Sequence, residues 1–115
     1  MKIPKQAPLF GGSTQNTKIT ELFYDTGELH YRFSQKSIND TDWVNEGSFE
    51  EYYQNGGLAK TGFFLNGTKN GHWKEYYKNG MPAAEGYYLS DGKQGIWKYY
   101  AKDGTLREEK FCDQS

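Results

Sequence analysis

The sequence contains almost no cysteine and no long apolar run. Its single cysteine, Cys112, rules out an intramolecular disulfide and favours a reducing, cytoplasmic setting. No stretch approaches the roughly 20 apolar residues of a transmembrane helix. The N-terminal residues MKIPKQAPLFGGSTQN lack the apolar core of a secretory signal peptide. We therefore expect a cytoplasmic protein.

Excess charge of either sign is also absent. The net charge is −1, from 14 Lys and Arg against 15 Asp and Glu. A nucleic-acid-binding domain usually carries a basic patch, and binding to an anionic membrane usually requires a basic cluster. The composition therefore disfavours nucleic acid as a partner, and it disfavours a membrane.

Residues for catalysis or metal binding are few and scattered. The two histidines, His30 and His72, lie in different parts of the chain. Residues 40–42 (Asp-Thr-Asp) begin like a calcium loop, but the ligand and glycine that should follow are missing, so an Asx-turn is the better interpretation. Adjacent glutamates, as in Glu50-Glu51, point to opposite faces of a strand and form no catalytic pair. We predict no enzyme activity, no metal site and no cofactor.

Aromatic residues are abundant instead. They make up 17% of the chain, whereas all hydrophobic residues make up 35%, and the mean hydropathy is −0.98. Each buried ring can remove about 150–250 Å² from water. A chain of 115 residues therefore forms one domain with a thin interior built from rings.

The rings recur with a period of 24 residues. The three stretches are GSFEEYYQNG at 47–56, GHWKEYYKNG at 71–80 and GIWKYYAKDG at 95–104. Each ends in Asn-Gly or Asp-Gly, the dipeptides that favour a two-residue type I′ loop in a β-hairpin. The 14 glycines at such positions exclude long helices. The repeat therefore predicts consecutive hairpins.

These loops also predict the cross-strand register. Near the loops, the expected pairs are Tyr53–Leu58, Tyr77–Pro82 and Lys78–Met81. Farther away they are Phe49–Gly62, Glu51–Lys60, Trp73–Gly86, Lys74–Glu85, Trp97–Lys110 and Lys98–Glu109. Opposite charges meet in all three hairpins and a ring faces glycine in two, and both arrangements stabilise sheets.

A degenerate unit precedes the three regular ones. Its turn is Thr26-Gly27, which sets Glu21 against Arg32 and Tyr24 against Leu29, and a polar excursion follows at 34–47. We expect a flexible leader at 1–18 and one repeat domain at 19–115. The domain divides into the degenerate repeat 19–46 and the repeats 47–70, 71–94 and 95–115.

The predicted fold is all-β: an antiparallel meander of about four hairpins that forms one elongated, twisted sheet. Strand alternation sorts the apolar residues onto two faces. The first face collects Phe49, Tyr53, Leu58, Phe64, Trp73, Tyr77, Tyr88, Trp97, Tyr99 and Leu106. The second collects rings together with charges, and its candidate partner-binding residues are Tyr52, Phe63, Tyr76, Tyr87, Tyr100, Arg107 and Phe111. The alternative role of these rings is structural, holding neighbouring repeats together.

The repeat resembles a known family. The pattern G-x-W-x-x-Y-Y-x-N-G followed by Glu-Gly-Tyr-Tyr, present as GHWKEYYKNGMPAAEGYYLSDGKQG at 71–95, is similar to the variant MORN repeat. The resemblance is clear over 47–106 and weak over 20–33. Thr20 stands where the other units have Phe or Trp, and Lys110 replaces the strand glycine. Terminal repeats often depart from the pattern as caps.

The resemblance implies a function. Proteins of this family are often antitoxin or immunity components, so we expect a protein-binding module that neutralises a cognate bacterial toxin by occlusion. The alternative is a repeat protein that binds carbohydrate, choline or a membrane surface, because tryptophan and tyrosine can cage cationic ligands and MORN proteins have been linked to membranes. The sequence does not specify which face binds or what the partner does.

Overall fold

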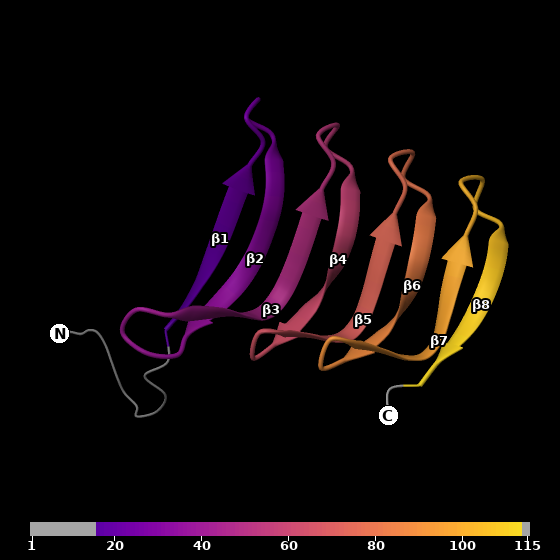
Figure 1. Cartoon of the computed structure of the whole chain (residues 1–115). Helices are drawn as coiled ribbons and strands as arrows, with labels where there is room; N and C mark the ends of the chain where they lie inside the picture. The colour runs from indigo at the N-terminus through magenta and orange to yellow at the C-terminus, as the bar shows by residue number, and fades with distance from the viewer. Residues whose placement is uncertain (1–15, 114–115) are drawn as a thin grey trace.

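Eight strands follow one another in the chain and occupy the same order in space (Figure 1). The computed structural model describes residues 16–113, and all of its regular structure is β. Every neighbouring pair is antiparallel, and the sheet has two open edges, at β1 and at β8. The strands are β1 Thr17–Phe23, β2 Leu29–Ser37, β3 Trp43–Tyr52, β4 Leu58–Leu65, β5 Thr68–Tyr76, β6 Pro82–Leu89, β7 Gly92–Tyr100 and β8 Leu106–Cys112. The predicted meander of four hairpins in one elongated, twisted sheet is confirmed, with principal extents of 56 × 42 × 20 Å.

The start of the sheet lies close to the expected boundary. β1 begins at Thr17, within the last two residues of the expected leader, and residues 1–15 lie outside the described part of the chain. The polar excursion is shorter than expected, because β2 continues to Ser37 and β3 already begins at Trp43. In the loop between them, Asn39 Oδ1 accepts hydrogen bonds from the backbone N–H groups of Thr41 and Asp42, at 2.9 and 2.8 Å. This is the expected Asx-turn, with Asn39 as its side-chain acceptor.

The predicted two-residue type I′ loops at the Asn-Gly and Asp-Gly sites are wrong. In the hairpin of β5 and β6, the N–H of Gly80 donates to the carbonyl of Tyr77 at 2.9 Å, and the N–H of Tyr77 donates to the carbonyl of Met81 at 2.8 Å. Gly80 has a φ of 90°, whereas Asn79 is not among the described residues with positive φ. The loop therefore has three residues and ends in a glycine bulge. Asn79 has a different role, because its Oδ1 accepts from the N–H of Met81 at 2.9 Å.

A second bulge restores the predicted register. Tyr76 faces Pro82, but one residue farther on Glu75 faces Ala84, so Ala83 is an extra residue in β6. The extra loop residue and this extra strand residue shift the register in opposite directions and cancel. All the pairs predicted far from the loops are therefore confirmed, and Glu21 faces Arg32 as expected. The pairs predicted next to the loops are wrong: the observed ones are Phe23–Leu29, Tyr52–Leu58, Tyr76–Pro82 and Tyr100–Leu106.

Type I′ loops form at the opposite ends of the strands. Asn66 and Gly67 have φ values of 51° and 88°, and Ser90 and Asp91 have 50° and 73°. The flanking pairs are Leu65–Thr68 and Leu89–Gly92, so each loop has two residues. Positive φ at both positions is what a type I′ turn requires. These loops join one hairpin to the next, and they turn the repeat into a continuous meander.

The interior consists of two tryptophans that lie on the glycines of the preceding hairpin. Trp73 and Trp97 are each 1% exposed. A Cβ built on Gly62 would lie 2.1 Å from the indole of Trp73, and one built on Gly86 would lie 2.3 Å from that of Trp97. The pairing of Trp73 with Gly86 is confirmed, yet its indole covers Gly62 instead. The glycines therefore serve contacts between repeats.

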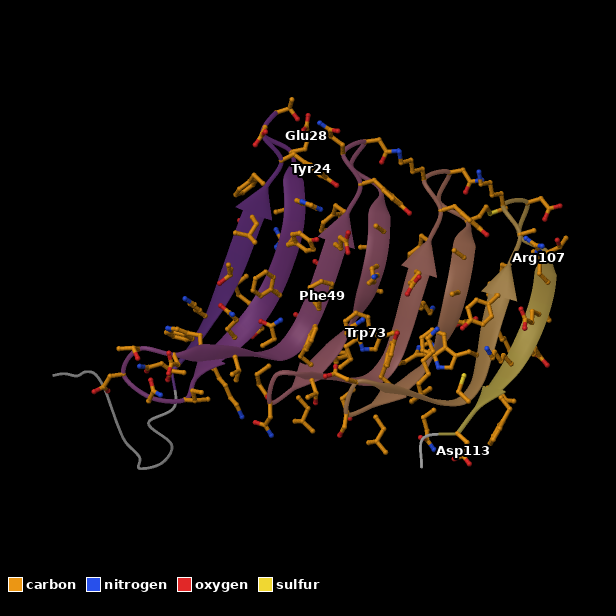
Figure 2. The ribbon with its side chains drawn as sticks, viewed as in Figure 1. Tyr24, Glu28, Phe49, Trp73, Arg107 and Asp113 are labelled. Carbon is orange, nitrogen blue, oxygen red and sulfur yellow. The ribbon has the colours of Figure 1, made fainter. Side chains whose placement is uncertain are left out.

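Hydrogen bonds hold each indole in this position. Trp73 Nε1 donates to the carbonyl of Phe63 at 3.0 Å, and Trp97 Nε1 donates to the carbonyl of Tyr87 at 2.9 Å. Phe49, Phe64 and Tyr88 pack around Trp73, with ring centroids 5.4–5.8 Å away. Figure 2 shows Phe49 on β3 beside Trp73 on β5. A buried indole needs such a partner for its N–H.

The terminal units modify this contact. Where the first unit meets the second, Phe33 stands at the glycine position and Phe49 at the tryptophan position, and their rings stack with centroids 6.2 Å apart. In the last unit Lys110 faces Trp97, as Gly86 faces Trp73. At the junction of the first and second units, two phenylalanine rings take the place of an indole that lies on a glycine. The last unit replaces the glycine by a long side chain on the final strand.

A second series of tyrosines ties the hairpin loops together. The hydroxyl of Tyr24 donates to the carbonyl of Tyr52 at 2.7 Å, and that of Tyr77 donates to the carbonyl of Tyr100 at 2.6 Å. Tyr53 makes the equivalent bond to the carbonyl of Tyr76. Each bond crosses from one repeat to the next. Rings therefore hold neighbouring repeats together both at the loops and in the interior.

The tyrosine bonds lead to a test. Tyr77→Phe removes only the hydroxyl, and we expect it to lower the free energy of unfolding by about 1 kcal/mol, since it leaves the Tyr100 carbonyl without this donor. Urea denaturation of the full chain measures the change. Tyr76→Phe is the matched control, because the described residues provide no hydrogen-bond partner for the Tyr76 hydroxyl. Equal effects of the two substitutions would show that the bond between repeats contributes nothing.

Candidate functional site

One face of the sheet is packed and the other exposes a line of rings. The packed face carries Trp73 and Trp97, while the opposite face carries Phe63 on β4, Tyr87 on β6 and Phe111 on β8. These three side chains, here called the aromatic row, are 57%, 58% and 68% exposed. They occupy matching positions in successive repeats, 24 residues apart. With strands 4.7–4.9 Å apart, the rings recur every ~9.5 Å across the sheet.

Aliphatic side chains enlarge the aromatic row. Leu65 and Leu89 lie two residues farther along β4 and β6, and Ile96 faces Phe111. All three are about half exposed. Ile96 was not among the candidate residues, although its alternation with Lys98 in β7 would have placed it on this face. Several exposed apolar side chains on one face of a sheet are a common mark of an interaction site.

A row of charges runs beside the aromatic row. Its members face one another from strand to strand in the order Glu21, Arg32, Glu50, Thr61, Lys74, Glu85, Lys98 and Glu109. Apart from Thr61, neighbours in this charge row have opposite signs. Arg32 forms ion pairs with Glu21 at 2.8 Å and with Glu50 at 3.8 Å. The charges nearly cancel, so this face has no strong potential of one sign.

Tyr52, Tyr76 and Tyr100 form a third line, here called the tyrosine row, on the far side of the charge row. The hydroxyl of Tyr52 donates to Glu50 at 2.8 Å, and that of Tyr100 donates to Glu85 at 2.7 Å. The Tyr100 bond, with Lys74 nearby, lowers the pKa of Glu85, and the same bond raises the pKa of Tyr100. Burial and the bond to Glu50 raise the pKa of Tyr52. All three tyrosines are half-buried, and the hydroxyls of Tyr52 and Tyr100 are held by the charge row, so the tyrosine row offers less free surface than the aromatic row.

Arg107 does not join the other candidates. It is the extra residue of the bulge in β8, between Leu106 and Glu108. Figure 2 shows it at the hairpin-loop end of β8, with Asp113 at the opposite end, where Phe111 also lies. Arg107 borders a hollow that is lined by Tyr77, Ala83, Tyr99, Tyr100 and Glu108. The same bulges move Leu58 and Leu106 from the first predicted face to the second, where they face Tyr52 and Tyr100.

The packed face leaves little room for a ligand on its tryptophans. Lys69 Nζ lies 5.2 Å from the ring centroid of Trp73 and 5.0 Å from that of Tyr88. Lys93 Nζ lies 4.8 Å from Trp97 and 5.4 Å from Tyr99. The protein's own ammonium groups therefore occupy the positions where a cationic ligand would bind to these rings. Because both indoles are almost fully buried, they offer no platform for stacking a sugar.

The histidines lie among aromatic rings. His30 stacks between Tyr24 and Tyr31, with both ring centroids 4.0 Å away, and His72 stacks on Tyr87 at 5.2 Å. His72 Nε2 also lies 3.4 Å from Glu85. Within residues 16–113, no three His, Cys, Asp or Glu side chains are placed to hold a metal ion. The same residues include no helix long and apolar enough to cross a membrane.

Comparison with known proteins identifies the repeats. A family model described as MORN repeat variant matches residues 45–66, 69–89 and 93–111, which is more than half of the chain. Each matched stretch contains at least one tryptophan or phenylalanine of the packed face and one ring of the aromatic row. No curated protein and no solved structure matches the chain. The match covers the last three units and not the degenerate first one.

Proposed function

Because the chain belongs to the MORN repeat variant family, we propose that it is a protein-binding module whose partner is a cognate bacterial toxin. Binding would occlude the toxin's active surface without any chemistry by this chain. The family resemblance supports the choice of partner, and the exposed face supports the mode of action.

The aromatic row is the observation that carries this proposal. Phe63, Tyr87 and Phe111 are more than half exposed, although each ring could bury about 150–250 Å². Aromatic residues are enriched in the centres of protein interfaces, and charged residues surround such centres. The charge row and the tyrosine row would form such a polar rim on one side of the aromatic row. For a stable complex on this face we expect a standard interface of about 1,200–2,000 Å².

Partner capture tests the proposal. The tagged full chain is recovered from its native cells, and bound proteins are identified by mass spectrometry. We expect one dominant, stoichiometric protein whose toxicity is suppressed when both are expressed together. Recovery of lipid or envelope fragments without a protein would contradict a proteinaceous partner. A captured protein without toxic activity would support the proposal that the chain binds a protein. It would contradict the proposal that this partner is a toxin.

Substitutions in the aromatic row test the site. The triple variant Phe63→Ala, Tyr87→Ala, Phe111→Ala should bind the captured partner at least about 100-fold more weakly, because interface rings commonly contribute more than 1 kcal/mol each. Its stability should change little, since the rings are exposed. Isothermal titration calorimetry and thermal unfolding measure the two effects. Ile38→Ala with Met81→Ala is the control, because both side chains are exposed and apolar but lie in loops.

A second double variant measures the width of the interface. Tyr76→Ala with Tyr100→Ala removes two members of the tyrosine row. If both this variant and the triple variant of the aromatic row bind the partner more weakly, the interface extends across the charge row. If neither variant changes the affinity, the partner does not bind to this face.

A further inference from the structure

The two edges of the sheet differ in how they are protected. Within residues 16–113, β1 and β8 each pair with a single neighbour, so each has one row of backbone N–H and C=O groups without a strand partner there. Natural edge strands are usually guarded by charged side chains, which prevent pairing with another chain. β8 has four such residues in sequence, at 107–110 (Arg-Glu-Glu-Lys). All four are exposed, and none forms an ion pair within residues 16–113.

β1 has no comparable guard. Its two charged residues are both engaged with inner strands: Glu21 pairs with Arg32 of β2 at 2.8 Å, and Lys18 Nζ lies 4.2 Å from the ring centroid of Trp43 on β3. Its apolar side chains are exposed, with Ile19 at 61%, Leu22 at 49% and Phe23 at 56%. The strand therefore presents open backbone groups, apolar side chains and no free charge. This combination favours strand addition.

We infer that the outer edge of β1 is a second interaction surface, which binds an extended segment of a partner protein as a ninth strand. Main-chain hydrogen bonds would provide the affinity, and alternate side chains would provide the specificity. The bound segment would place apolar residues next to Ile19 and Phe23. It would need no charged residue in its middle, because Lys18 and Glu21 of β1 already contact inner strands.

This edge is continuous with the exposed face. Ile19 and Phe23 alternate with Glu21, which begins the charge row, so they lie on the same side of the sheet as the aromatic row. A partner on that face could therefore extend a strand along β1 without crossing to the other side. A second copy of this chain fits less well. The seven residues of β1 fall far short of the 20–30 residues a side of a stable interface.

A peptide tests the inference without the natural partner. The probe is LAKTGFFLKK, which is residues 58–65 followed by two lysines for solubility. This segment pairs with β5 in the sheet, and β5 occupies the position in its repeat that β1 occupies in the first. The fluorescein-labelled peptide is titrated into the full chain. Hydrogen exchange then follows the amides of β1 and β8 in its presence.

We expect saturable binding and slower exchange in β1 but not in β8. The double variant Ile19→Lys, Phe23→Lys should bind at least tenfold more weakly, whereas Lys110→Glu on the other edge should bind normally. The control peptide LAKPGFFLKK should not bind, because proline removes a ladder donor and distorts the strand. Equal binding of both peptides, or protection of β8 alone, would overturn the inference. A dimer of the full chain that Ile19→Lys abolishes would also overturn it, in favour of self-pairing.

The test is independent of the toxin proposal. It requires no cognate partner, and in the full chain it changes no residue of the aromatic row. Failure of the peptide test would leave the proposed interface on the exposed face unaffected. Failure of partner capture would leave strand addition to β1 unaffected.

Discussion

Replacing Gly86 by alanine is expected to lower the free energy of unfolding by about 3 kcal/mol, at the upper end of the cost of overpacking. The added Cβ would lie 2.3–2.5 Å from three atoms in the middle of the Trp97 indole. The indole cannot move aside easily, because it is 1% exposed and its Nε1 is bonded to the carbonyl of Tyr87. Chemical denaturation of the full chain measures the loss. A change below about 0.5 kcal/mol would show that the indole does not depend on this glycine.

Two variants separate the contact from a general effect on the strand. Lys110→Ala changes the position of β8 that corresponds to Gly86 in β6, where the described chain has no following indole, and it should be nearly neutral. Trp97→Phe in the Gly86→Ala background should recover part of the loss, because a smaller ring leaves room for the Cβ. The junction of the first and second units already uses this solution, with Phe33 and Phe49 in place of glycine and tryptophan.

Trp73→Ala is expected to have the largest effect of any single substitution, about 3–5 kcal/mol. Trp73 lies in the middle of the sheet and packs against rings from three other strands: Phe49, Phe64 and Tyr88. Its removal opens a cavity over Gly62 and eliminates the bond to the carbonyl of Phe63. In repeat proteins, stability depends on contacts between neighbouring units. The variant should therefore also uncouple the two halves of the sheet.

Denaturation followed by two probes detects this uncoupling. We expect a single transition in the parent chain and two separated transitions in Trp73→Ala when far-UV circular dichroism is compared with tryptophan fluorescence, which in this variant comes from Trp43 and Trp97. Trp43→Ala is the matched control, because Trp43 is only partly buried and lies outside the main ring cluster. A single, unchanged transition in Trp73→Ala would mean that the backbone ladder alone couples the repeats.

The architecture was predictable because the 24-residue period repeats both rings and turn residues. In the repeats 71–94 and 95–115, the glycine of the Asn-Gly or Asp-Gly loop has a positive φ and the tryptophan is buried, so local conformation and burial agree there. The exact turn type was not predictable from Asn-Gly alone. Asn79 accepts from Met81 N–H and donates to the carbonyl of Lys102 in the next hairpin at 2.9 Å, and only the assembled sheet provides that second partner.

The candidate site was predicted in part. Alternation placed Phe63, Tyr87 and Phe111 on one face, and the structure brings them together with Tyr52, Tyr76 and Tyr100 on the other side of the charge row. Arg107 was placed with them because alternation counts every residue, whereas a bulge adds one that faces no partner. Alternation also could not show which face is buried, since both faces carry rings.

By itself, the sequence determined the repeat, the antiparallel meander and the register far from the loops. These features depend on local turn preference and on cross-strand pairs, both of which are written in short segments. Only the tertiary structure decided which rings are interior. Trp73 and Trp97 are buried because each indole lies between a glycine of the preceding repeat and a lysine of its own strand. The contact between indole and glycine joins two different hairpins, so the pairing within each predicted hairpin does not show it. With that face filled, Phe63, Tyr87 and Phe111 point to the other side of the sheet, where each stays more than half exposed.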